Sequence, residues 1–91
     1  MTRQRTRSHV DSATPSVQTV ADAQAAIIAR LAAPRLTRDE LVPFYAAMIR
    51  TIHAEKAWEG VGDVNAAIAN RWTWRGLDYI KRKAWIMAGA A

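Results

Sequence analysis

The chain has no cysteine among its 91 residues. That absence excludes disulfide bonds, thiolate zinc sites and cysteine-based catalysis, and it favours a reducing, cytoplasmic location. No part of the sequence approaches the ~18 consecutive apolar residues that a membrane-spanning helix requires, so we expect no membrane span. The first ten residues are basic but lack the apolar stretch of a secretory signal.

Side chains suited to catalysis are also scarce. The two histidines, His9 and His53, lie far apart in the sequence, and every serine lies within the first sixteen residues. His53 and Glu55 are two positions apart, a spacing that places them on different faces of a helix. Because a catalytic or metal site needs several such groups in a defined geometry, we predict no enzyme, no metal site and no cofactor.

Acidic residues are outnumbered, with 8 Asp and Glu against 13 Lys and Arg, which gives a net charge of +5. This balance favours anionic partners such as nucleic acid. Residues 1–18 are polar, contain Arg3, Arg5 and Arg7, and show no hydrophobic periodicity. We predict a flexible basic tail there, in front of a single domain over residues 19–91.

Hydrophobic residues recur at helical spacing through the remaining chain, and no stretch alternates as a β-strand would. The sequence therefore predicts an all-α fold, a small four-helix domain. The expected helices cover residues 20–33, 38–58, 64–72 and 74–88, with Thr19, Thr37, Asp63 and Thr73 as their N-caps. The second begins with Thr37-x-x-Glu40, the pattern of a capping box.

The few prolines and glycines mark expected boundaries. Pro34 would end the first helix, because proline disfavours a helical conformation at the residue before it. Pro43 lies inside the second helix and predicts a kink or a separate first turn. Residues 60–62, Gly-Val-Gly, would form a tight turn after that helix, since the segment is too short for a phosphate-binding loop.

The stretch from residue 63 to 82 resembles a helix-turn-helix motif. Trp72 and Thr73 match the apolar residue and hydroxyl cap at the turn, and Leu77 and Ile80 match the inward positions of the second helix. Three features depart from the motif. Arg71 stands where the turn usually has glycine, and Asn70 stands just before it, where the motif usually has an apolar residue. Gly76 lies inside the second helix, where it costs about 1 kcal/mol relative to alanine.

The side chains left outside would be the candidate contacts. Leu77, Ile80, Ala84 and Met87 are expected to face inward, together with core tryptophans at positions 58, 72 and 85. The predicted nucleic-acid contacts are Arg71, Arg75, Lys81, Arg82 and Lys83, and the predicted partner contacts are Trp74 and Tyr79. The alternative for the cations is an ordinary solvated helix surface.

Two functions follow from these patterns. The first is a small basic helical module that binds nucleic acid, with DNA favoured over RNA, by itself or as a small subunit of a nucleoprotein complex. The alternative is an assembly module that docks on a larger protein complex, or on a second copy of itself, without touching nucleic acid. The small core and the many tryptophans motivate this alternative.

Overall fold

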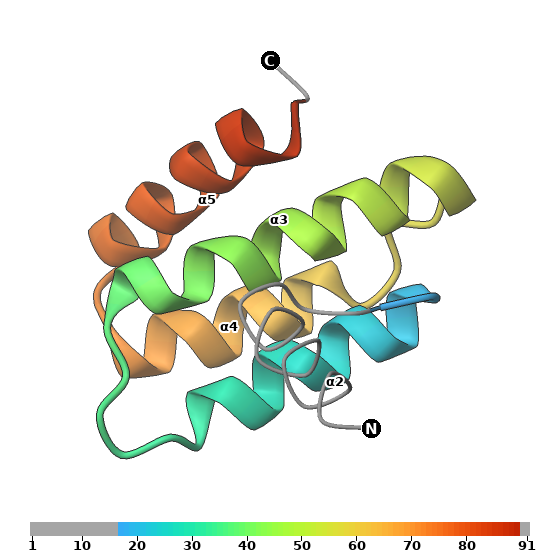
Figure 1. Cartoon of the computed structure of the whole chain (residues 1–91). Coiled ribbons are helices and arrows are strands. Elements are labelled where there is room, and N and C mark those ends of the chain that lie inside the picture. Colours follow the sequence, from blue (N-terminus) through green and yellow to red (C-terminus); the bar gives the residue numbers. More distant parts are fainter. Residues whose placement is uncertain (1–16, 90–91) are drawn as a thin grey trace, which may run out of the picture.

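The computed structural model describes residues 17–89, which contain four helices and no strand. They are α2 (Val20–Leu31), α3 (Arg38–Glu55), α4 (Val61–Arg71) and α5 (Trp74–Ala88). The predicted all-α class is confirmed. Figure 1 shows that each helix reverses the direction of the one before it, so the chain runs back and forth. Most of the predicted basic tail lies outside the described residues, and Val17 already packs against the core.

Three predicted helix starts are confirmed by their cap hydrogen bonds. The hydroxyl of Thr19 accepts from the Asp22 amide at 3.0 Å, and that of Thr73 accepts from the Gly76 amide at 3.3 Å. The capping box of α3 is complete, because the Glu40 carboxylate accepts from the Thr37 amide at 2.8 Å while the Thr37 hydroxyl accepts from the Glu40 amide at 3.3 Å. These bonds occupy backbone donors that have no partner inside the helix.

The predicted start of α4 is wrong. Asp63 lies inside the helix, and Gly60 occupies the N-cap with φ of 81°, a left-handed conformation that favours glycine. The turn before it is attached to α2, since the Gln24 side chain donates to the Glu59 carbonyl at 2.9 Å. This contact joins residues 35 positions apart, so no local sequence pattern predicts it.

Two other boundaries differ from prediction. Helix α3 ends at Glu55 rather than near residue 58, because Lys56 adopts a left-handed conformation with φ of 55°. Pro43 lies inside α3, but the helix is continuous from Arg38, so no separate first turn exists. Helix α2 ends at Leu31, two residues earlier than expected.

Helix α3 is the centre of the packing. It packs against both α2 and α5 (Figure 1). Helix α4 packs against the same two helices. The most completely buried large side chains are aliphatic, and α3 supplies more of them than any other helix: Ile27, Leu41, Met48, Ile49, Ile52, Ile68 and Ile80. An ion pair of 2.6 Å between Arg30 and Glu40 joins the end of α2 to the start of α3.

Gly76 is buried inside the first turn of α5. Within a helix, alanine is ordinarily more favourable than glycine. A methyl group at this position would lie 2.8 Å from the Cβ of Trp72, closer than carbon atoms normally approach. The glycine therefore allows the Trp72 side chain to fold back over the start of α5. Packing, rather than helix propensity, accounts for the residue.

We expect Gly76→Ala and Gly62→Ala to change stability in opposite directions. Gly62 also lies in a helix, but no atom lies within 4 Å of the position its Cβ would take. Gly62→Ala should raise the free energy of unfolding by up to about 1 kcal/mol through helix propensity. Gly76→Ala should lower it by about 1–2 kcal/mol through overpacking. Urea unfolding of both variants measures this difference, and a stabilised Gly76→Ala protein would contradict the packing explanation.

Candidate nucleic-acid contact surface

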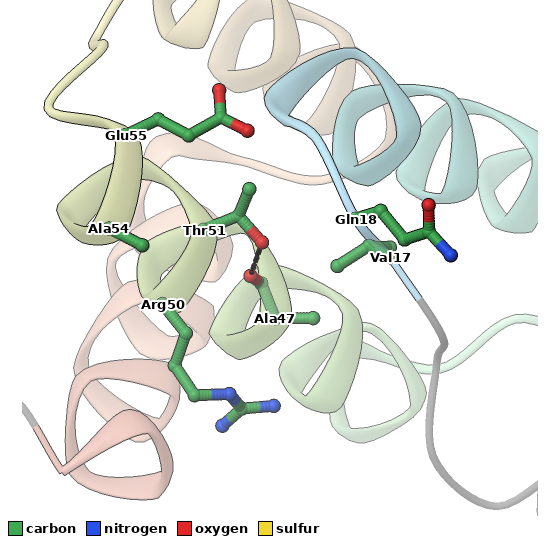
Figure 2. Close-up of a pocket in the computed structure, with 7 residues that line it drawn as sticks. All are labelled: Val17, Gln18, Ala47, Arg50, Thr51, Ala54 and Glu55. Carbon is green, nitrogen blue, oxygen red and sulfur yellow. Dashed lines mark hydrogen bonds between the residues drawn. The ribbon is translucent and has the colours of Figure 1, made fainter.

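The hollow beside α3 in Figure 2 does not gather reactive groups. It lies between residues 17–18 and the second half of α3. The Thr51 hydroxyl donates to the Ala47 carbonyl at 2.9 Å and is occupied within its own helix. Figure 2 shows the Arg50 and Glu55 side chains at opposite ends of the hollow, so no set of polar groups converges there.

The outer face of α5 carries most of the predicted contacts. Arg75, Asp78, Arg82 and Lys83 are all exposed on this helix. Arg82 forms an ion pair of 2.9 Å with Asp78 one turn earlier, which neutralises the only carboxylate of α5. Both side chains are well exposed, so this pair is weak and its guanidinium stays accessible.

Arg71 is not a free cation of this face. Its guanidinium donates to the carbonyl of Leu31 at 2.9 Å and to the carbonyl of Ala33 at 3.2 Å. Those carbonyls lie at the end of α2, where backbone acceptors have no partner within the helix. Arg71 therefore joins the end of α4 to the end of α2, a role that its sequence position beside the turn did not reveal.

Tyr79 is likewise engaged within the fold. Its hydroxyl donates to the Asp39 carboxylate at 2.5 Å, which connects α5 to the first turn of α3. The guanidinium of Arg38 lies 4.3 Å from the ring centroid and the ammonium of Lys83 lies 5.6 Å from it. The hydrogen bond to Asp39 raises the pKa of Tyr79, because it stabilises the protonated hydroxyl. Both predicted contacts, Tyr79 and Lys83, thus border the α3–α5 junction.

The burial of the four tryptophans differs in part from the prediction. Trp74 is 67% exposed, as expected, but Trp58 is 53% exposed and is not a core residue. Trp72 and Trp85 are half-buried against the core. Since the interior is already filled by aliphatic side chains, the indoles cover its edges instead. The predicted inward position of Met87 is also wrong, because this side chain is 53% exposed.

A shallow groove runs along the flank of α5 that faces α4. Trp74, Asp78, Lys81 and Trp85 follow one another at spacings of four, three and four residues, so they share this flank. Asn65 of α4 lines the groove beside Lys81. This shared flank was not predicted from the sequence, although the helical spacing of the four side chains indicates it.

Next to this groove lies a hollow of about 160 Å³, and Asn65 and Lys81 border both. Trp58, Trp85 and Lys81 border it together with aliphatic side chains of α3. The His53 ring lies against both indoles, with centroids 5.5 Å from Trp58 and 5.3 Å from Trp85, in edge-to-face geometry. Cavities of about 150 Å³ with apolar walls can hold a benzene ring, so this hollow has room for one aromatic ring.

One polar contact closes the inner wall of the hollow. The Tyr45 hydroxyl donates to the Asn65 side-chain carbonyl at 2.8 Å and connects α3 to α4. Burial raises the pKa of Tyr45 to about 12, while the hydrogen bond to Asn65 acts in the opposite direction. The hollow therefore has a neutral inner wall at physiological pH.

Clustered metal ligands, a membrane-spanning helix or similarity to a known protein would each bear on the function. Within residues 17–89, no three His, Asp or Glu side chains gather closely enough to hold a metal ion. None of the helices in this range is both long and apolar enough to cross a membrane. No family model matches the chain, and no significantly similar curated protein or solved structure was found. Any functional assignment thus depends on the side chains described above.

We expect Arg71→Ala to reduce stability and Arg75→Ala to leave it nearly unchanged. The first removes the donors that bind the last carbonyls of α2, so the free energy of unfolding should fall by about 1 kcal/mol. The second alters an exposed side chain and should shift that energy by less than about 0.5 kcal/mol. Thermal unfolding monitored by circular dichroism compares them, and equal effects would contradict the capping role.

Alkaline pH should weaken the fold through Tyr45. Its pKa lies at about 12 in the folded chain against an ordinary value of 10.0, so the folded state holds its proton more tightly. The resulting stability is complete below pH 10.0 and is lost as pH rises toward about 12. The free energy of unfolding of the wild type should therefore fall relative to that of Tyr45→Phe over this range, which changes the gap between the two proteins. A constant gap in urea unfolding would contradict burial of the hydroxyl.

Proposed function

We propose that this chain is a small nucleic-acid-binding module whose contact element is α5. The supporting observation is the charge of this helix. Between residues 74 and 83 it presents Arg75, Lys81, Arg82 and Lys83 against the single carboxylate of Asp78. A surface with this excess of cations attracts phosphate and releases bound counterions when it binds. Such a role agrees with the cytoplasmic location expected from the cysteine-free composition.

The position of α5 supports this role. The helix packs against α3 and α4 through one side, and Figure 1 shows it at the edge of the bundle. Its buried side consists of Gly76, Leu77, Ile80 and Ala84, so none of its cations is needed for the core. Arg75 and Arg82 are seven residues apart, which places them about 10 Å apart along one face of the helix. Two guanidinium groups on one face can each contact a phosphate.

Two of the predicted contacts have smaller roles in this proposal. Arg71 is held by the carbonyls of α2, and Tyr79 is held by Asp39. We assign the phosphate contacts to Arg75 and Arg82 first, with Lys81 and Lys83 on the two flanks. Phosphate contacts of this kind need no insertion of α5 into a groove, so they are independent of the helix-turn-helix resemblance.

A second candidate function is docking on a protein. Ile86 is 69% exposed and Met87 is 53% exposed, and both border a hollow between α3 and α5 that also includes Val42. Exposed aliphatic side chains beside a hollow are typical of protein contact sites. A small subunit of a nucleoprotein complex would combine the two functions, holding a protein at the end of α5 and nucleic acid along its length.

Binding should weaken steeply with salt and should depend on Arg75. Each phosphate contact contributes about −0.9 to the slope of log K against log salt for duplex DNA and about −0.7 for a single strand. Arg75→Gln should make this slope less steep by about one contact. Arg50→Gln is the matched control, because it removes the same charge from an exposed site on α3. Fluorescence anisotropy with labelled duplex and single-stranded oligonucleotides, titrated across salt, measures both slopes.

The outcomes separate the two candidate functions. Equal loss of affinity in Arg75→Gln and Arg50→Gln would show that net charge, rather than α5, determines binding. If neither nucleic acid binds at low salt, the proposal fails. If, in addition, the molecular mass in solution increases with protein concentration, the result supports docking on a second copy of the chain.

A further inference from the structure

We propose that the α4-facing flank of α5 binds a single strand of nucleic acid by stacking its bases on tryptophan. This inference rests on the proposed function and goes further, because it names the form of nucleic acid and a second face of the helix. The flank is the row Trp74, Asp78, Lys81 and Trp85, with Trp58 beyond its far end. The outer face with Arg75 and Arg82 does not belong to it.

The tryptophans of this flank are placed as stacking surfaces. Trp74 begins α5 and Trp85 lies eleven residues later, so their backbones are about 16 Å apart along the helix. Trp74 is 67% exposed and Trp58 is 53% exposed, which leaves indole surface open to solvent at both ends of the groove. Stacking of a base on an aromatic side chain requires an unpaired strand, because the faces of paired bases are covered by their neighbours in a duplex.

The hollow between Trp58 and Trp85 suits a single ring. Its volume of about 160 Å³ is enough for one aromatic group, and its walls are mostly apolar or aromatic. His53 supports both indoles from one side. Because the Tyr45 hydroxyl and the Asn65 carbonyl are already bonded to each other, the inner wall accepts an apolar face without leaving that pair unsatisfied.

The charge of the groove favours a nucleic-acid strand over an acidic protein segment. Lys81 borders both the hollow and the shallow part of the groove that contains Trp74, so it lies between the two stacking ends. Asp78, the carboxylate on the same flank, lies 2.9 Å from the Arg82 guanidinium, which offsets part of its charge. A cation between aromatic groups matches the alternation of phosphate and base along a strand. A purely acidic segment such as polyglutamate would meet the same cation but has no ring to stack on the indoles.

The test uses the full chain with a labelled oligothymidylate of about 15 nucleotides, a length within the footprint of small single-strand-binding domains. Anisotropy measures affinity, and tryptophan fluorescence reports stacking through quenching. The variants are Trp74→Ala and Lys81→Gln, with Ile86→Ala as a control that removes a similarly exposed side chain elsewhere on α5. A duplex of the same length and polyglutamate serve as comparison ligands, and circular dichroism verifies that each variant is folded.

We expect the single strand to quench the fluorescence and to bind more tightly than the duplex. Trp74→Ala should weaken its binding about 5- to 150-fold, the range for loss of one base stack. Lys81→Gln should reduce the salt slope by about 0.7, and Ile86→Ala should match the wild type.

Four results would overturn the inference. If Trp74→Ala and Ile86→Ala bind the single strand equally, or if the duplex binds more tightly, the groove is not the site, although the proposed function stands. If polyglutamate quenches the tryptophans as strongly as the oligonucleotide, the flank takes acidic protein segments instead. If neither strand form binds, the inference fails together with the proposed function.

Discussion

Burial of α3 between α2 and α5 is the interaction on which the rest of the structure depends. The helix contributes eight buried residues, several of them large aliphatic side chains, and no other element contributes as many. In a chain of this size the core is small, so its few large side chains must all meet in one place. That place is the central part of α3. The remaining helices are arranged to bring Ile27, Ile68 and Ile80 to it.

This packing determines where the aromatic residues lie. Once the aliphatic side chains fill the interior, an indole cannot enter without displacing several of them. Trp72 and Trp85 therefore lie half-buried at the edges of the core, while Trp58 and Trp74 extend further into solvent. The same competition accounts for Gly76, since the Trp72 side chain occupies the space beside the first turn of α5. The surface of α5 is thus a consequence of how the core is filled.

The faces of α5 differ in chemistry because the helix is buried on one side only. Its outer face carries Arg75 and Arg82, which are exposed cations and the phosphate contacts of the proposed function. Its α4-facing flank adds the aromatic surface of Trp74 and Trp85, which the proposed single-strand binding would use for stacking. The two faces are adjacent on one helix, so a single strand bound along the flank as proposed would remain within reach of the cations.

The features that could be predicted from the sequence alone depend on residues close together in the chain. The helix starts at Thr19, Thr37 and Thr73 were predicted because a cap hydrogen bond joins residues three positions apart, and the exposure of Trp74 followed from its place beside such a cap. Only the tertiary structure decided the start of α4, the role of Arg71 and the exposure of Trp58. Each depends on a partner or a packing competitor far away in the chain: Gln24 for the turn before α4, the end of α2 for Arg71, and the filled core for Trp58. Local hydrogen bonds can be predicted from spacing, whereas competition for a small core is resolved only when all four helices meet.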